Sequence, residues 1–365
     1  MRVRLCKAAL RYGGGLVLHT ATSGAVPTLD ELYLAADDGD RRVGNAGVRV
    51  NIAYLTGTPA EVLEAEIVAA VTGFAWARGI DGLAADLDSG KLRLSAPALM
   101  LLDGLVHDAR ARAAGKPLAA FLDGKFEPSV ATNQTLFWSD DATMLARADA
   151  YVARGFADLK LRVAVQGFAD DARRLGLLRQ RFGAKIKLAV DANGRWSEDE
   201  ARANLASLAP FGLAYVEQPV AAGDWEAAAR VAAASPVPIM LDESLASLDD
   251  VRMLARTRAA PLGHLKLVKL GGIAPTLRAA SILRNAGIGL MIGQMNEGGL
   301  CTAAAAHVAA ATRPAHAELY GADGLIDDPA PGLAYAKGKV RLTDAPGLGL
   351  DLDVGKTTLL WETTA

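Results

Sequence analysis

Three acidic residues follow short apolar runs at nearly equal steps along the chain: Asp191, Glu217 and Asp242. The steps are 26 residues (191 to 217) and 25 residues (217 to 242), the length of one strand and one helix with their loops. Like charges held close together are costly unless a cation lies among them, so the three carboxylates predict a metal site. Oxygen ligands without Cys or His favour Mg²⁺, with Mn²⁺ as the alternative, over zinc.

Two lysines on apolar strands complete a set of residues for acid–base chemistry. Lys160 stands in Lys160-Leu161-Arg162, and Lys266 follows Asp242 after a further step of 24 residues (242 to 266). A lysine beside a divalent cation is shifted toward its neutral form and can act as a base near neutral pH. The metal would stabilise the enediolate formed when a carboxylate substrate loses its α-proton. We therefore predict that Lys160 and Lys266 are catalytic.

The strands that would carry these residues alternate with helical segments from about residue 130 onward. Repeated strand–helix units with apolar strands predict a parallel sheet covered by helices. Seven or eight units in roughly 200 residues favour a closed (β/α) barrel over an open sheet. The expected strands are 131–136, 158–163, 186–191, 214–217, 239–242, 264–267, 289–292 and 315–319, with helices that include 170–182, 197–208 and 225–233.

The remaining segments predict a smaller domain beside the barrel. Strand-like runs at 31–36 and 47–53 precede helical runs at 59–70 and 96–113, which is typical of an α+β domain. We expect the cap to span residues 1–115, the barrel 116–325, and a C-terminal segment 326–365 with one short strand to return to the cap.

The composition excludes several classes of partner. The 365 residues carry a formal net charge of −2 and no clustered basic arm, which gives no reason to expect nucleic acid. The sequence contains no run of about 18 apolar residues, so we do not expect a membrane-spanning helix. Only Cys6 and Cys301 occur, and the N-terminus lacks a signal-peptide pattern, so we expect a cytoplasmic protein.

Four motifs surround the acids and the second lysine: Asp191-Ala-Asn193, Glu217-Gln-Pro219, Asp242-Glu-Ser244 and Lys266-Leu-Val-Lys-Leu-Gly-Gly272. As a set they resemble the signatures of the enolase superfamily. Within it, they are similar to the muconate-lactonising-enzyme branch of the mandelate racemase/muconate lactonising enzyme family. The resemblance implies an α/β fold, a modified TIM barrel (β/α)7β with an N-terminal α+β capping domain. It also implies an isomerase or lyase that binds a small carboxylate as a homo-oligomer.

The resemblance further implies a role for individual residues. Asp191, Glu217 and Asp242 would bind the metal, while Asn193 and Glu243 would orient those ligands. Lys266 matches the catalytic lysine of the sixth strand, and Glu297 matches an acidic residue near the substrate. No His stands at the end of the seventh strand, which argues against the mandelate-racemase branch proper.

One residue departs from the family pattern. The second strand of the family usually carries Lys-x-Lys with the second lysine as a base, and here that position is Arg162. An arginine stays charged and is a poor base, but it suits bidentate binding of a substrate carboxylate. If Lys160 takes over as base, racemisation or epimerisation stays open. If it does not, Lys266 is the sole base and one-face chemistry is favoured.

Substrate choice is expected to lie in the cap and at the first barrel strand. The glycine-rich stretch near residues 12–25 is where the family places a mobile specificity loop, and glycines give such a loop its freedom. Asn133 and Gln134 on the first strand would face the pocket, together with Arg162 and Glu297.

On the resemblance, isomerisation ranks first: cycloisomerisation, racemisation or epimerisation, including that of an amino-acid derivative. Three further readings stay open beside it. A dehydratase would eliminate water from a hydroxy acid or hydroxyproline with Lys266 as the only base. A barrel aldolase would use Lys266 or Lys269 as a Schiff base. A non-catalytic protein would bind carboxylates on the same scaffold.

Overall fold

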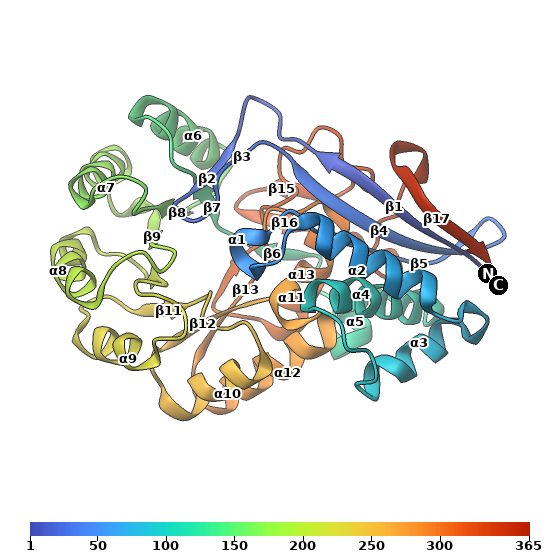
Figure 1. Cartoon of the computed structure of the whole chain (residues 1–365). Helices are drawn as coiled ribbons and strands as arrows, with labels where there is room; N and C mark the ends of the chain where they lie inside the picture. The colour runs from blue at the N-terminus through green and yellow to red at the C-terminus, as the bar shows by residue number, and fades with distance from the viewer.

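Eight parallel strands form the central sheet of the computed structural model, which describes residues 1–365 (Figure 1). Their order in the sheet is β14-β13-β12-β11-β10-β9-β8-β7, so each strand pairs with its neighbours along the chain. A backbone hydrogen bond from the N–H of Asn133 to the carbonyl of Ala317 (3.1 Å) links the first strand region to the last. The strands are β7 (Gln134–Leu136), β8 (Asp158–Arg162), β9 (Lys187–Asp191), β10 (Val216–Glu217), β11 (Ile239–Leu241), β12 (Leu262–Lys266), β13 (Gly289–Gly293) and β14 (His316–Glu318).

A helical crossover follows each of the first seven strands, which gives the (β/α)7β arrangement expected from the resemblance. The helices lie outside the strands (Figure 1). They are α6 (Asp141–Ala153), α7 (Phe168–Phe182), α8 (Glu198–Leu208), α9 (Trp225–Ala234), α10 (Leu248–Thr257), α11 (Leu267–Leu270) with α12 (Ile273–Asn285), and α13 (Gly299–Thr312).

Local signals explain why these helices begin where they do. Ser197 caps α8 by accepting a hydrogen bond from the N–H of Glu200, and the Glu200 side chain binds back to the Ser197 N–H. This reciprocal pair satisfies two backbone donors that the first helical turn leaves free. Asp140 and Ser247 cap α6 and α10 more simply, because their side chains accept from the N–H groups of Thr143 and Asp250.

The cap is built on an antiparallel sheet of order β17-β1-β4-β5 with helices packed on it. The tail returns to the cap, because β17 pairs with β1 along its length and brings both chain ends together (Figure 1). The cap elements are β1 (Arg2–Leu10), β2 (Leu18–Thr20), β3 (Gly24–Val26), β4 (Leu29–Asp38), β5 (Arg41–Arg49), α1 (Ala53–Thr56), α2 (Ala60–Gly73), η1 (Trp76–Arg78), α3 (Gly79–Asp88), α4 (Ala96–Ala113), α5 (Leu118–Asp123) and β17 (Thr358–Thr364).

Two details of the cap differ from the sequence-based expectation. The first strand, β1, was missed because the basic residues of Arg2–Leu10 obscure its alternation of exposed and buried positions. The tail contains three strands rather than one, since β15 (Ala334–Ala336) and β16 (Lys339–Arg341) form a small sheet with β6 (Ser129–Ala131). The domain limits at residues 115 and 325 stay predictions.

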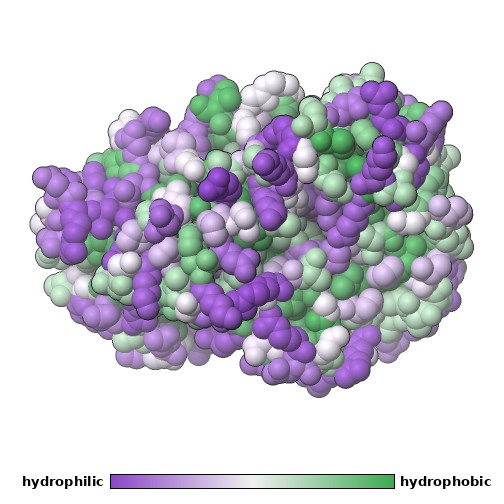
Figure 2. Space-filling view, turned by 180° about the vertical axis from the view of Figure 1, so that it is seen from behind, coloured by the Kyte–Doolittle hydropathy of each residue, from purple (hydrophilic) through white to green (hydrophobic).

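The cap and the barrel share a continuous apolar interior. A cluster of 82 buried residues includes cap residues such as Leu34 and barrel residues such as Val190. The large hydrophobic side chains left exposed are Val17, Val62, Phe121, Ile326 and Leu359, and one face of the surface mixes hydrophilic and hydrophobic residues (Figure 2). No single helix is long and apolar enough to cross a membrane, although the bent pair Ala60–Gly73 and Trp76–Asp88 passes that test by length and composition together.

Candidate active site

The three acids predicted to bind metal lie at one rim of the barrel. Asp191 ends β9, Glu217 ends β10, and Asp242 directly follows β11. Parallel strands end at the same edge of a sheet, so the steps of one strand–helix unit bring these side chains together. All three are almost wholly buried, with at most 2% of the residue surface exposed.

Each acid has a basic partner from a neighbouring or facing strand. The Nζ atom of Lys160 lies 3.0 Å from Glu217 Oε2 and 3.7 Å from Asp191 Oδ2. Arg162 forms an ion pair with Asp191, and the Nζ atom of Lys266 lies 2.7 Å from Asp242 Oδ2. The two lysines and the arginine therefore do converge on the acids, as their strand positions predict.

Burial alone would lower the pKa of Lys266, but the carboxylates of Asp242, Glu318 and Glu217 outweigh it and hold that pKa above its ordinary value. Lys266 is therefore an ammonium group in this charge state. It can become a base only when the charge of these carboxylates is engaged by another cation.

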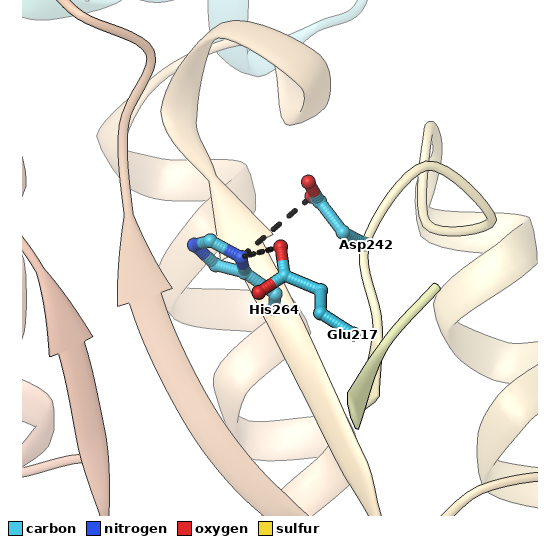
Figure 3. Close-up of side chains that lie close together, drawn as sticks. All are labelled: Glu217, Asp242 and His264. Carbon is cyan, nitrogen blue, oxygen red and sulfur yellow. Dashed lines mark hydrogen bonds and ion pairs between the residues drawn. The ribbon is translucent and has the colours of Figure 1, made fainter. Parts of the chain in front are cut away.

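His264 belongs to the same cluster, although the sequence analysis gave it no role. Its Nδ1 atom lies 3.0 Å from Glu217 Oε1 and 3.9 Å from Asp242 Oδ1 (Figure 3). Burial and the charge of Lys266 lower the pKa of His264, so the ring is neutral and Nδ1–H donates to Glu217. The available signal was its position two residues before Lys266 on β12, because side chains two apart share a face of a strand.

The backbone of β13 leaves room for this histidine. A Cβ atom added at Gly293 would lie only 2.0 Å from His264 Nε2, closer than any real contact. The ring therefore packs directly over the glycine at the end of the next strand.

Residues of this rim fit a divalent cation. Oxygen atoms of Glu217 and Asp242 and a nitrogen of His264 lie within 4.8 Å of one another, with Asp191 linked to Glu217 through Lys160. Asn193 Oδ1 and Glu243 Oε2 are buried acceptor atoms without a hydrogen-bond partner. The carboxylate and amide oxygens of this rim suit Mg²⁺ or Mn²⁺, whereas His264 Nδ1 is engaged with Glu217 Oε1 and stays outside this donor set.

Asn193 and Glu243 contact each other beside the acids. The Asn193 side-chain amide donates to Glu243 Oε1 at 3.0 Å, and the Asn193 backbone N–H donates to Asp191 Oδ1 at 2.9 Å. Gln218, which the sequence analysis did not single out, likewise supports one of the acids through hydrogen bonds. Its Oε1 atom accepts from the backbone N–H groups of Asp242 (2.9 Å) and Ser244 (3.2 Å), which fixes the loop after β11.

A cavity of ≈ 60 Å³ opens above the acids and lies between barrel and cap. This volume holds a few water molecules or a compact ligand. The barrel side contributes Arg162, Asn193, Asp242, Glu243 and Lys266, with Phe137, Met295 and Asn296 from adjacent loops. The cap side contributes Leu18, Thr20, Thr22, Ser23, Val26, Tyr54 and Leu55, which overlaps the glycine-rich stretch near residues 12–25.

Besides Asp191 and Glu217, which are fully buried, four of the residues predicted at the site do not line this cavity. Lys160 is fully buried beneath it and also pairs with Glu318, the last residue of β14. Asn133 donates to the same Glu318 at 3.2 Å. Gln134 points away from the barrel interior and donates to Asp323 at 2.7 Å, because adjacent residues of a strand face opposite sides.

Glu297 is the fourth, and it faces the cap strand β4. Its Oε2 atom accepts from the Met295 N–H, its Oε1 atom has no partner, and burial raises its pKa to about 8. The value of about 8 already includes a smaller rise caused by the neighbouring Glu31 and an opposing effect of Arg49.

A larger cavity of ≈ 520 Å³ lies at the opposite end of the barrel, where Asp158 begins β8 and His316 begins β14. None of the three acids lines it. We assign the site to the smaller cavity, because function in such barrels collects at the carboxyl ends of the strands.

Known proteins with related sequences support this assignment. A family model described as "Enolase C-terminal domain-like" matches residues 143–356. Chloromuconate cycloisomerase from Pseudomonas putida is 34% identical over 259 residues, 70% of each chain. L-Ala-D/L-Glu epimerase from Bacillus subtilis is 31% identical over 249 residues, 67% of this chain and 68% of that protein.

The fold has equally clear counterparts among solved structures. Muconate lactonizing enzyme from Pseudomonas fluorescens, in complex with muconolactone, superimposes with a TM-score of 0.88 at 25% identity. The superposition covers 97% of this chain and 96% of that one. Enzymes of this superfamily generally use Mg²⁺. The chain is an enzyme of the enolase superfamily and belongs to its muconate-lactonising-enzyme-like branch.

Proposed function

We propose that the protein removes the proton α to a substrate carboxylate with Lys266 as the only base, and that isomerisation follows on one face of the substrate. Asp191, Glu217 and Asp242 would hold Mg²⁺, with Mn²⁺ as an alternative. When bound, the cation supplies positive charge that stabilises the negative charge developing on the substrate carboxylate.

The observation that carries this proposal is the contrast between two basic side chains in the cavity wall. Lys266 on β12 and Arg162 on β8 line the cavity, whereas Lys160 does not. Lysine can lose its proton and act as a base, but arginine stays charged. One face of the substrate would therefore meet a base and the other a fixed cation.

Lys160 is better suited to positioning than to catalysis. Its ammonium group contacts Glu217 and Glu318 and has no exposed surface, so it holds the acids from below. We therefore propose a positioning role for Lys160 in place of the catalytic role expected from the sequence. Asn133 contacts Glu318 and would support the same cluster, while Gln134 is left out because it binds Asp323.

Single-base chemistry favours cycloisomerisation over racemisation or epimerisation. Inversion at the α-carbon needs a proton delivered from the second face, and Arg162 occupies that side of the cavity. The same geometry supports a second candidate, a dehydratase. In it, Lys266 would remove the α-proton from the same face of the substrate from which the hydroxyl group leaves as water.

Exchange of the α-proton in D₂O, followed by NMR over amino-acid derivatives, hydroxyprolines, sugar acids and muconates, tests the proposal. We expect Mg²⁺-dependent exchange without inversion, and its loss in EDTA and in Asp242→Asn. Exchange with full racemisation would contradict the single base. Metal binding with no exchange in any carboxylate would favour the non-catalytic binding protein, and borohydride trapping would favour the Schiff-base aldolase. A homo-oligomeric state and a cytoplasmic location stay predictions.

A further inference from the structure

The two walls of the cavity differ in charge. The charged residues that line it are Arg162, Asp242, Glu243 and Lys266, and all four belong to the barrel. The cap contributes aliphatic, hydroxyl and phenol side chains only. We infer that the substrate is a monocarboxylate whose remaining part is uncharged and largely apolar. The inference rests on the proposed function, which places the carboxylate at the barrel wall.

The charge balance at the barrel wall accommodates one substrate carboxylate. The cluster contains five carboxylates, of Asp191, Glu217, Asp242, Glu243 and Glu318, and four cations, of Lys160, Arg162, Lys266 and Lys269. A divalent cation would turn this single excess negative charge into a single positive one while Lys266 is an ammonium group, and into no net charge when Lys266 is the neutral base. A first carboxylate therefore meets a wall without excess negative charge, and a second finds no compensating positive charge there.

The cap wall offers little to a second charged group. Leu18, Val26 and Leu55 present aliphatic surface there. The hydroxyls of Thr20 and Ser23 bind each other at 2.9 Å, and Ser23 also donates to the Gly24 carbonyl at 2.8 Å. These two hydroxyls are thus already engaged within the β2–β3 hairpin.

Beside the Thr22 hydroxyl, which contacts only the Thr20 hydroxyl at 3.4 Å, Tyr54 is the cap side chain with a polar tip suited to a neutral ligand group. Its ring lies under the guanidinium of Arg49, 5.9 Å from ring centroid to Cζ, and its hydroxyl makes no hydrogen bond within the protein. A ligand carbonyl or hydroxyl could therefore bind there. A phenol does not neutralise a charge.

The nearest charged groups behind the cap wall are committed to other contacts. Arg49 donates to the side chain and carbonyl of Asn51 and to the carbonyl of Asn296, and it has no exposed surface. Glu297 faces Glu31, and the ring of His19 packs edge-on against Trp138 at 5.0 Å. A second charge on the substrate would lose its water without gaining a partner, which is strongly unfavourable.

Pairs of carboxylates that differ in one charge test the inference. N-acetyl-glutamine is compared with N-acetyl-glutamate, N-acetyl-asparagine with N-acetyl-aspartate, and Nα-acetyl-norleucine with Nα-acetyl-lysine. The Mg²⁺-loaded enzyme is assayed for α-proton exchange and, separately, for binding by saturation-transfer NMR. We expect the member of each pair that has no charge besides its α-carboxylate to exchange and bind at least about 100-fold better.

The two readouts separate the possible failures. If no compound exchanges while the neutral members bind preferentially, the proposed chemistry is wrong and the inference stands. If the charged members exchange or bind as well as their neutral partners, the inference is overturned whatever the chemistry. Failure of all compounds to bind would also overturn it.

A change in the cap wall adds a gain-of-function test. Leu55→Arg places a cation opposite the barrel wall and should narrow the preference for the neutral member of the acidic pairs by about 10-fold or more. Leu55→Met, a change of similar volume without charge, is the matched control and should leave the preference unaltered. If Leu55→Arg and Leu55→Met change this preference equally, the charge of the cap wall does not decide it, and the inference is overturned.

Discussion

Strands β8 and β12 lie four positions apart in the eight-stranded barrel, so they face each other, and each carries two basic side chains two residues apart. The deeper pair, Lys160 and His264, bind opposite oxygens of Glu217 at 3.0 Å each. The outer pair, Arg162 and Lys266, line the cavity. The strands thus share the task of holding Glu217 and differ in what they offer the substrate.

On each strand, the deeper residue thus holds Glu217 in place, and the outer residue faces the substrate cavity. In the proposed function, a residue beneath the rim sets the position of a carboxylate that would bind the metal, and the residue two places further would set which protons can move. Exchanging the outer residue should therefore change the reaction, and exchanging the deeper one should change metal affinity.

The largest expected effect concerns the outer residue of β12. Lys266→Ala removes the only base in the cavity wall, so α-proton exchange should fall by about 10²–10⁴-fold. Calorimetric titration with Mg²⁺ serves as the control and should show binding retained. Persistent exchange in this variant would mean that a base on β8 does the work.

The deeper residue of β12 should act through the metal instead. His264→Leu removes the donor to Glu217 Oε1, and Mg²⁺ affinity measured by calorimetry without substrate should fall by about 10–100-fold. His264→Asn offers an amide N–H near the position of Nδ1 and should recover part of the loss. Equal affinities in the wild type and the Leu variant would refute the positioning role.

A smaller change is expected when the outer residues of the two strands are made alike. Arg162→Lys gives β8 a group that can lose its proton, so exchange should gain a second stereochemical face. Chiral analysis of the deuterated substrate measures the gain. Unchanged stereochemistry would show that Arg162 does not exclude two-base chemistry.

A buried acid outside β8 and β12, Glu31, provides a control for the comparison of these two strands. Glu31 on β4 accepts from the Gly298 N–H and the Tyr33 hydroxyl, and burial raises its pKa from 4.5 to about 7. Because the folded pKa exceeds the unfolded one, the folded state binds more protons between these values. Stability is therefore fully present below about pH 4.5 and is lost as the pH rises to about 7, by about 3 kcal/mol if the whole shift is realised.

Glu31→Gln keeps the shape of the side chain and removes its titration. Urea unfolding at pH 5 and pH 8 should show a smaller fall in the free energy of unfolding than in the wild type, and exchange stereochemistry should not change. A pH dependence of stability equal to that of the wild type would contradict the assignment to Glu31.

Periodicity predicted the barrel well because its strands are short, apolar and evenly spaced. All eight strands appear within a few residues of their expected positions, and the charged residues at their ends meet at one rim. The first cap strand was missed because its basic residues obscure the alternation of exposed and buried positions, and because one of its partners, β17, lies at the other end of the chain.

The sequence predicted which residues belong to the site better than it predicted which way their side chains point. The strand register decides that Gln134 faces Asp323 while Asn133 faces the barrel interior, and an error of one residue reverses this. His264 was missed because an isolated histidine on an apolar strand is usually a core residue. Its role depends on the depth at which it meets Glu217, which only the three-dimensional arrangement provides.

The contact between His264 and Gly293 has a consequence for attempts to evolve new activities from this chain. The two positions form an epistatic pair, since no side chain at 293 is compatible with the imidazole at its present place. Libraries that vary one strand end at a time will score residue 293 as invariant, whereas joint variation of 264 and 293 would open sequences that single steps cannot reach.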